Sequence, residues 1–273
     1  MLHASGREII SNKDEQDMRV GVVGSGNVAE SLVQGLKEGG LDVVQVFARN
    51  EARGTKLAEM VGSQWSHSEL AEADLYIISV SDSAVAEVAA SLSIPEGAVV
   101  AHTTGCCPMD ALLPHEHRAV LYPFQTFSAG RKVDFTKGYI FLEGATDHAL
   151  AVVEEVAHRL TDKVEMADGA RRSVIHLSGV FSSNFVNAMY ENATEVLSRE
   201  GLSFDVIAPV IEETALKALA SRNPRAVQTG PARRGDTPTL ERHRAMLDGD
   251  DLKREIYDKI SEDIWRKAEI SKR

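Results

Sequence analysis

The feature of this sequence that most restricts its fold is a short apolar run leading through two glycines into a helix-like segment. Residues 20–32 read VGVVGSGNVAESL, in which VGVV is typical of a buried strand and Gly24 and Gly26 stand where a helical pattern begins. A strand, a glycine turn and a helix in this order belong to α/β folds, in which helices pack back onto a parallel sheet. The neighbouring sequence must therefore supply further strands and helices in alternation.

That alternation continues through the first half of the chain. Short apolar runs, several of them continuously apolar, are separated by segments whose apolar residues lie three and four apart. The runs are RVGVVG, DVVQVFA, SQWSH, LYIISV, AVVAHTT, RAVLYPF and YIFLE. They predict a Rossmann-type α/β domain over residues 18–165, a doubly wound parallel sheet with helices on both faces.

After about residue 165 the pattern becomes helical. Apolar residues recur every three or four positions from Ala170 to Glu200, which predicts one long helix ended by Gly201. Further helices are expected through VIEETALKALAS, TPTLERH and DLKREIYDKISEDIW. Residues 166–273 are thus predicted to form an all-α domain. Because helices this long exceed what a small unit needs, we expect their apolar faces to meet a second copy in a homodimer.

Composition argues against several kinds of partner. The 273 residues carry 30 Lys and Arg against 41 Asp and Glu, a formal charge of −11 that repels nucleic acid and anionic lipid. No apolar run reaches the roughly 20 residues of a membrane span. We therefore expect a small-molecule substrate, no nucleic acid or membrane partner, and a cytoplasmic location. Residues 1–17 lack a hydrophobic signal core and are expected to be a disordered arm.

The cysteines and possible metal ligands are less informative. Cys106 and Cys107 are adjacent, where a bridge between them would be strained, so we interpret them as a reduced pair. The alternative is a catalytic thiol, whose pKa a following helix N-terminus would lower. No metal site is expected.

The glycine turn predicts a dinucleotide site. In the dinucleotide-binding fold the first glycine permits the tight turn, the second lets the backbone approach the pyrophosphate, and the third position packs helix against strand. Free N–H groups at the helix start then face the phosphates. The alternative is a glycine-rich turn without a ligand. The residues expected to bind cofactor here are Gly24, Ser25, Gly26, Asn27, Val28 and Ala29.

The residues after the second apolar run favour NADP over NAD. An NAD site usually places Asp or Glu about 20 residues beyond the glycines, where it binds the ribose 2′-OH. This chain has Arg49 and Asn50 there, with Arg53 one helical turn later. Arginine suits a 2′-phosphate, so we expect these three residues to bind the phosphate of NADP. The alternative is a solvated helix start, in which Glu51 weakens the positive field.

Later strands are expected to line the nicotinamide half of the cofactor, because the carboxyl ends of parallel strands meet in one crevice. His102, after the fifth run, is either a catalytic residue in contact with substrate or a buried, hydrogen-bonded histidine, and both alternatives stay open. The other candidates in this group are Ser79, Val80, Ser81, Asp82, Thr103, Gly105 and the segment YPFQT at 122–126.

The long helical segment offers further catalytic candidates. At 100° per residue, His176, Ser183 and Asn187 lie within about 40° of one another, with Asn184 at the edge of this face. We predict that either His176 or His102 supplies or orients a proton and that Asn184 hydrogen-bonds the substrate or the cofactor's carboxamide. Packing of a neighbouring helix against this small-residue face is the alternative.

A loop at 223–236, NPRAVQTGPARRGD, supplies the last candidate. Loops of this length in compact domains are commonly functional or disordered. Arg234 is predicted to clamp a substrate carboxylate, since its guanidinium makes bidentate bonds to such groups. Asp236 more simply caps the following helix.

These segments also carry a family resemblance. GSGNVAESL, HTTG, YPFQTFS, HLSGVFSSNFVNAMYENATEVL and TGPARRGDTPTLERH together resemble bacterial Rossmann-like proteins whose second half is a helical domain of unknown function, over residues 18 to about 248. The resemblance implies an NADP oxidoreductase of the deazaflavin-dependent type. The first half is also similar to pyrroline-5-carboxylate reductase, whose helical second half forms dimers and whose chemistry is NADPH-linked hydride transfer to an imine or carbonyl.

We therefore expect an NADP(H)-dependent oxidoreductase acting on a small carbonyl or imine held in a cleft between the Rossmann and helical domains. The cofactor performs the hydride chemistry and protein groups position and polarise the acceptor. The alternative is a non-catalytic NADP-binding or sensing protein that acts through its dimer contacts.

Overall fold

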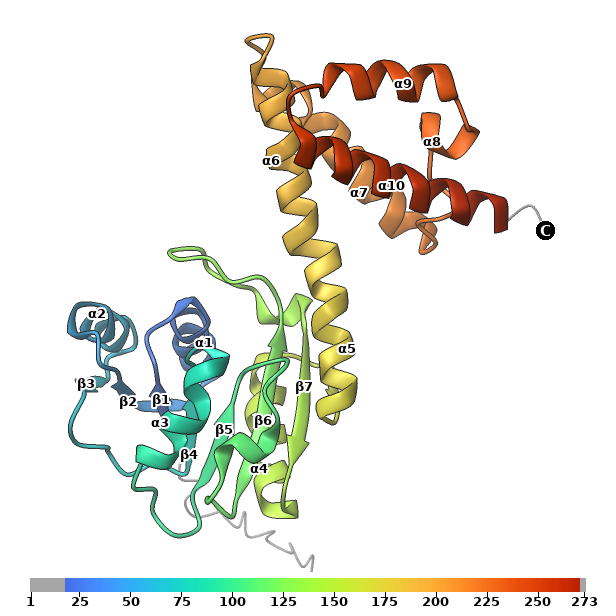
Figure 1. Cartoon of the computed structure of the whole chain (residues 1–273). Coiled ribbons are helices and arrows are strands. Elements are labelled where there is room, and N and C mark those ends of the chain that lie inside the picture. The colour runs from blue at the N-terminus through green and yellow to red at the C-terminus, as the bar shows by residue number, and fades with distance from the viewer. Residues whose placement is uncertain (1–17, 271–273) are drawn as a thin grey trace, which may run out of the picture. The chain divides into compact units, whose positions relative to one another are not determined.

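The computed structural model describes residues 18–270, which form two compact units that divide between Ser183 and Asn184. The first unit contains one eight-stranded sheet covered by helices, and the second contains only helices (Figure 1). Residues 1–17, predicted as a disordered arm, lie outside the described residues. The predicted order, an α/β half followed by an all-α half, is confirmed.

The strands of the first unit include all seven that the apolar runs predict. They are β1 Arg19–Val23, β2 Asp42–Phe47, β3 Gln64–Ser66, β4 Leu75–Ile78, β5 Val99–His102, β6 Arg118–Phe124, β7 Tyr139–Gly144 and β8 Val164–Met166. Their order in the sheet is β3-β2-β1-β4-β5-β6-β7-β8. The change of direction between β1 and β4 is the topological switch of a doubly wound fold.

One pair of strands departs from the parallel sheet that we predicted. β7 runs antiparallel to β6, and β8 then runs parallel to β7. A parallel partner would need a crossover, usually a helix. Residues 125–138 between β6 and β7 contain only the 3-10 turn Phe135–Lys137, so the chain reverses direction there instead.

The first unit also extends beyond residue 165, where the strand patterns end. β8, which the sequence did not indicate, adds a three-residue edge strand to β7, and the helix that follows it belongs to the same compact unit. An edge strand this short carries little pattern, and Glu165 and Met166 at its end are exposed.

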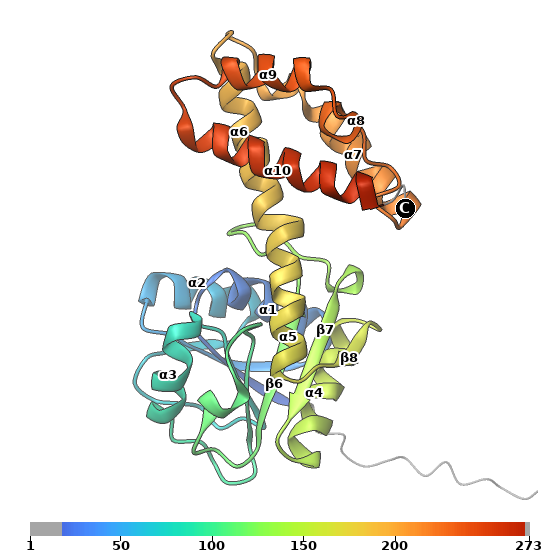
Figure 2. The same cartoon turned by 45° about the vertical axis from the view of Figure 1, so that its right-hand side comes forward.

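Helices cover both faces of the sheet. α1, α2 and α4 share a core with one face, while α3 and α5 pack on the other (Figures 1 and 2). Apolar stripes explain this: Ala29, Leu32, Val33 and Leu36 of α1 are all fully buried. The helices of the first unit are α1 Asn27–Glu38, α2 Glu51–Val61, α3 Val85–Ser91, α4 Asp147–Leu160 and α5 Gly169–Gly179.

Polar contacts link several helices of the second unit. Across α9 and α10, the His243 Nδ1 and Tyr257 hydroxyl lie 2.8 Å apart, and Arg244 binds Asp258 at 2.6 Å. Asp236 caps α9 by accepting the Thr239 N–H, which confirms its predicted role. The helices are α6 Phe185–Ser198, α7 Ala208–Ser221, α8 Pro231–Arg234, α9 Thr237–Met246 and α10 Asp251–Ile270.

The single long helix predicted from Ala170 to Glu200 is interrupted. Between α5 and α6 the backbone forms a π-helical turn, Val180–Asn184. The predicted alignment of His176 with Asn187 assumed 3.6 residues per turn throughout, and a wider turn breaks that period. Within the described residues, no helix is both long and apolar enough to span a membrane.

Candidate functional site

The glycine turn after β1 is tightly packed on one side and open on the other. Gly24 has φ of +120°, and a Cβ there would lie 2.2 Å from the Ser79 carbonyl oxygen. Only glycine fits such a position. Gly26 precedes α1 without a side-chain cap, and a Cβ on it would meet nothing within 4 Å. The space beside Gly26 is therefore open and the start of α1 has no side-chain cap, which suits a helix start that binds phosphate.

Side chains around the start of α1 tie it to two other segments. The Asn27 Oδ1 accepts a 3.1 Å hydrogen bond from Arg53 of α2, and the Asn27 Nδ2 lies 3.5 Å from the Phe127 carbonyl oxygen. The buried Glu30 carboxylate accepts the Gly130 N–H at 3.2 Å and lies 4.0 Å from Arg53. The glycine turn is thus braced by α2 and by the loop after β6.

The three residues predicted to bind a 2′-phosphate differ in their surroundings. The Asn50 side chain caps α2 by accepting the Arg53 N–H at 3.0 Å, so its oxygen is already used. The Arg53 guanidinium is held at the start of α1. Arg49, at the carboxyl end of β2, is exposed and has no hydrogen-bond or ion-pair partner among the described residues. Arg49 is therefore the best placed of the three to meet a phosphate.

The predicted cofactor-contacting segments leave the sheet at one edge. Val23 pairs with Ile78, and Ile78 pairs with His102, so β1, β4 and β5 end in register. The glycine turn, residues 79–82 and residues 103–105 follow these three strands directly. The structure therefore brings these predicted residues, Ser79, Val80, Ser81, Asp82, Thr103 and Gly105, to the same carboxyl edge.

His102 is fully buried beneath that edge. Its Nδ1 accepts the Thr104 N–H at 3.2 Å, and the Thr104 hydroxyl accepts the Cys107 N–H at 3.1 Å. Burial, with the nearby Arg172 charge, lowers the pKa of His102 to about 4. The ring is therefore neutral near pH 7 and helps to shape the loop after β5, which favours the structural alternative for this residue.

His176, on α5, lies beside Tyr122 of β6. The Tyr122 hydroxyl and the His176 Nδ1 are 3.3 Å apart. The backbone of Gly105 passes so close that a Cβ there would lie 2.8 Å from the His176 Nδ1 and 2.9 Å from the Tyr122 Cζ. Loop, strand and helix therefore converge on this pair of side chains.

A buried arginine, Arg172 of α5, binds the loop that follows β5. It was not among the residues predicted from the sequence. Its guanidinium is fully buried, forms an ion pair with Glu143 of β7, and donates to the carbonyl oxygens of Ala167 and Cys107 at 3.1 Å each. The sequence nevertheless contains a feature that could have indicated this residue. Arg172 lies three residues before Ile175, on the apolar face of the helix, where an arginine needs a buried partner.

Cys106 and Cys107 are both free thiols, as the sequence predicts. Burial raises the pKa of each thiol, and the Asp82 carboxylate raises it further. The surroundings thus keep the thiols protonated and do not favour the catalytic alternative. Within residues 18–270, no cluster of three or more His, Cys, Asp or Glu side chains is arranged to hold a metal ion.

The remaining two catalytic candidates belong to the helical unit. Asn184 ends the π-helical turn, and Arg234 is the last residue of α8, with an exposed side chain 4.0 Å from Asp236. The one-turn helix α8 lies within the segment 223–236 that was predicted as a loop. The predicted roles of Asn184 and Arg234 stay predictions.

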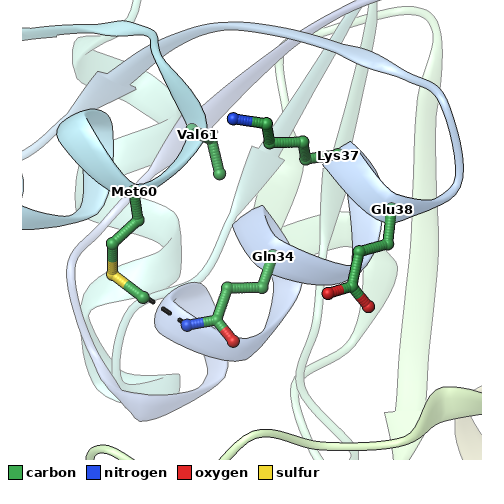
Figure 3. Close-up of a pocket in the computed structure, with 5 residues that line it drawn as sticks. All are labelled: Gln34, Lys37, Glu38, Met60 and Val61. Atoms are coloured by element: carbon green, nitrogen blue, oxygen red, sulfur yellow. Dashed lines mark hydrogen bonds between the residues drawn. The ribbon is translucent and has the colours of Figure 1, made fainter.

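A surface groove of about 550 Å³ lies between α1 and α2 (Figure 3). Gln34, Lys37 and Glu38 line it from the last half of α1, so it is roughly 10 to 16 Å along the helix from the glycine turn. The Gln34 amide reaches the Met60 sulfur at 3.9 Å across it. The groove is therefore separate from the candidate cofactor site.

Two family models match the chain. Residues 19–104 match "NADP oxidoreductase coenzyme F420-dependent", and residues 138–264 match "Domain of unknown function (DUF2520)". A comparison with curated proteins found no match.

Solved structures with the same fold cover nearly the whole chain. A "putative NADP oxidoreductase" from Bacteroides fragilis is 36% identical, with 92% of this chain and 98% of that chain covered and a TM-score of 0.86. A reductive aminase from Aspergillus terreus in complex with NADPH and ethyl levulinate is 16% identical, over 92% and 93%, with a TM-score of 0.67. A pyrroline-5-carboxylate reductase from Coxiella burnetii is 17% identical, over 93% and 98%, with a TM-score of 0.52.

The last two similarities show the fold alone, whereas the first, with the two family models, also shows the family. The predicted resemblance is thereby confirmed. This chain belongs to the family of Rossmann-like proteins in which an NADP oxidoreductase domain of the coenzyme F420-dependent type is followed by a DUF2520 domain.

Proposed function

We propose that this protein is an NADP(H)-dependent oxidoreductase that acts on a small carbonyl or imine compound. The observation that carries the proposal is the turn at Gly24 and Gly26, which is closed against Ser79 on one side and open at an uncapped helix start on the other. That arrangement fits the pyrophosphate of a dinucleotide. Membership of an NADP oxidoreductase family supports the same cofactor.

The two arginines near the turn have separate roles in this proposal. Arg49, exposed and unpaired among the described residues, binds the 2′-phosphate through charge-assisted hydrogen bonds. Arg53 is held by Asn27 at 3.1 Å and lies 4.0 Å from Glu30, so it braces the helix start beside the pyrophosphate. Variants of Arg49 should therefore change the preference for NADPH over NADH, and variants of Arg53 should weaken both cofactors alike.

NADPH, when bound, supplies a hydride from its nicotinamide ring. The residues of this chain supply the surroundings of the reacting atoms. The segments that follow β4 and β5 line the edge beside the glycine turn, and Thr103 and Ser79 are buried there. The named neighbours include a reductive aminase and a pyrroline-5-carboxylate reductase, which supports an imine or carbonyl as the substrate class.

We further propose that the helical unit is covered by a second copy of the chain. No residue of α6 or α7 is buried, and α7 exposes Val210, Leu216 and Leu219. Faces of this kind are removed from water in symmetric dimers, where the same surface of each copy meets its equivalent.

The test of the enzymatic proposal follows the near-ultraviolet absorbance of NADPH. The purified full chain is mixed with NADPH and a panel of small ketones, aldehydes and their methylamine imines. We expect NADPH oxidation that depends on both protein and panel compound. NADPH binding with no turnover of any compound would instead support the non-catalytic sensing alternative, and absence of NADPH binding would overturn both.

A further inference from the structure

The pair formed by Tyr122 and His176 lies at the edge of the sheet where the cofactor is proposed to bind. Val120 of β6 pairs with His102, the last residue of β5, so Tyr122 stands two residues beyond the end of β5. That places it at the carboxyl edge of the sheet, the edge that also carries the glycine turn. The pair is built entirely within the first unit.

The surroundings of Tyr122 fix its ring. Phe124 and Phe141 contact it with ring centroids 6.2 and 6.3 Å away, and the tyrosine is 8% exposed. The opposite side is closed by Gly105, whose missing side chain leaves room for both rings of the pair. A hydroxyl held this firmly is oriented before any substrate arrives, which is the property that a positioned acid requires.

Nearby groups keep that hydroxyl protonated. Burial raises the pKa of Tyr122 to about 12, and the negative charges of Cys106, once it ionises at high pH, and of Asp82 add to this, against a smaller opposite effect of Arg172. The phenol is therefore a hydrogen-bond and proton donor throughout the neutral range. An alkoxide formed from a carbonyl is a much stronger base than such a phenolate, so proton transfer to it is downhill.

We propose that Tyr122 is the catalytic proton donor of the reduction and that His176 is the positioning residue that returns the proton to it. This inference rests on the proposed function. As the acceptor carbon gains a hydrogen with its electron pair from NADPH, the Tyr122 O–H bond breaks and a new O–H or N–H bond forms on the product. The His176 Nδ1–H then gives its proton to the phenolate oxygen, 3.3 Å away, as Nε2 takes up another proton, so that no imidazolate forms. His176 is half-buried and regains its proton from solvent.

A purely structural pair is the competing explanation, since a buried tyrosine hydroxyl usually has a hydrogen-bond partner. The two explanations predict different effects on stability and turnover when the hydroxyl is removed. A structural hydroxyl contributes modestly to stability and nothing to the chemical step. A catalytic hydroxyl contributes roughly 100-fold or more to turnover.

The experiment compares Tyr122→Phe with a matched control, Tyr139→Phe, which removes a hydroxyl from an exposed tyrosine of β7. NADPH affinity, melting temperature, kcat and KM are measured with the panel compound that the wild type reduces best. We expect Tyr122→Phe to lower kcat by roughly 100-fold with NADPH affinity unchanged, and Tyr139→Phe to behave as wild type. The same turnover in both variants would overturn the inference and leave the proposed function intact.

His176 is tested with two variants. His176→Asn keeps an amide near the position of Nδ1 and so keeps a hydrogen bond to Tyr122, but it cannot relay a proton, whereas His176→Ala loses both. We expect both variants to lower kcat with little change in KM and to alter the solvent deuterium isotope effect on kcat. If His176→Asn restores full turnover, the relay is wrong and only orientation matters. If the wild type binds NADPH but reduces no compound of the panel, the proposed function fails and this inference fails with it.

Discussion

The two units of this chain bury their apolar residues to very different extents. Among the described residues, all buried apolar side chains but three belong to the sheet unit, and the exceptions are Ala232, Leu247 and Ala268. The sheet unit completes its core within one chain because its strands are covered on both faces. The helical unit leaves many apolar side chains exposed, including those on the faces that we propose a second copy covers.

The units also differ in the polar groups that they bury. The sheet unit encloses His102 and Arg172 completely, next to the edge where the cofactor is proposed to bind. The charged pairs of the helical unit, such as Arg199 with Asp250, remain partly exposed. We therefore expect substitutions in the sheet unit to change stability and cofactor affinity, and substitutions on the helical faces to change assembly.

The largest effect is expected at Gly24. Gly24→Val brings a side chain against the Ser79 carbonyl and forces a branched residue into φ of +120°, so NADPH affinity should fall by roughly 100-fold or more, together with the melting temperature. Gly97→Ala is the matched control, since Gly97 also has positive φ but a Cβ there meets nothing within 4 Å. Equal losses of NADPH affinity in the two variants would contradict the assigned role of the turn.

The next effect is expected at Arg172. Arg172→Met leaves the Glu143 carboxylate without its buried partner, so the free energy of unfolding measured with urea should fall by about 3–5 kcal/mol. Arg171→Met, which breaks an exposed pair with Glu165, should cost less than about 1 kcal/mol. Adding Glu143→Gln to Arg172→Met should recover part of the loss, and no recovery would mean that the ion pair is not its source.

The pH dependence of stability is expected to reflect His102. Its pKa is about 4 in the folded protein and 6.5 without the fold, so between these values the unfolded chain binds a proton that the folded protein does not. Stability should therefore be highest above pH 6.5 and should fall by about 3 kcal/mol as pH drops toward 4. In His102→Gln, the free energy of unfolding measured with urea should fall less steeply with decreasing pH than in the wild type. An equally steep fall in both proteins would show that His102 is not the cause.

The smallest effect on cofactor affinity is expected from the helical faces. Leu219→Glu places a charge on the exposed face of α7 and should shift the protein from dimer to monomer in light scattering, with NADPH affinity unchanged. Leu113→Glu, at an exposed leucine of the sheet unit, is the matched control and should leave the assembly as it is. A wild-type monomer would refute the proposed dimer outright.

Local patterns predicted most of the fold and much less of the candidate site. Short apolar runs indicated seven strands, and several of these runs are continuously apolar because strands buried on both faces need them. The antiparallel direction of β7 and the π turn at 180–184 depend on connections and packing that no local period records. The approach of Tyr122 to His176, 54 residues apart, arises from the packing of α5 on β6, so the sequence could name the histidine but not its partner.

Calorimetric titration with NADPH and NADH measures whether the sheet unit holds NADP(H) through its glycine turn and Arg49. We predict that the wild type binds NADPH roughly 10-fold or more tightly than NADH, because Arg49 makes charge-assisted bonds to the 2′-phosphate. Arg49→Gln should remove most of that difference by weakening NADPH alone. Equal affinities of the wild-type protein for the two cofactors, or an equal loss of both in Arg49→Gln, would show that Arg49 does not bind the 2′-phosphate.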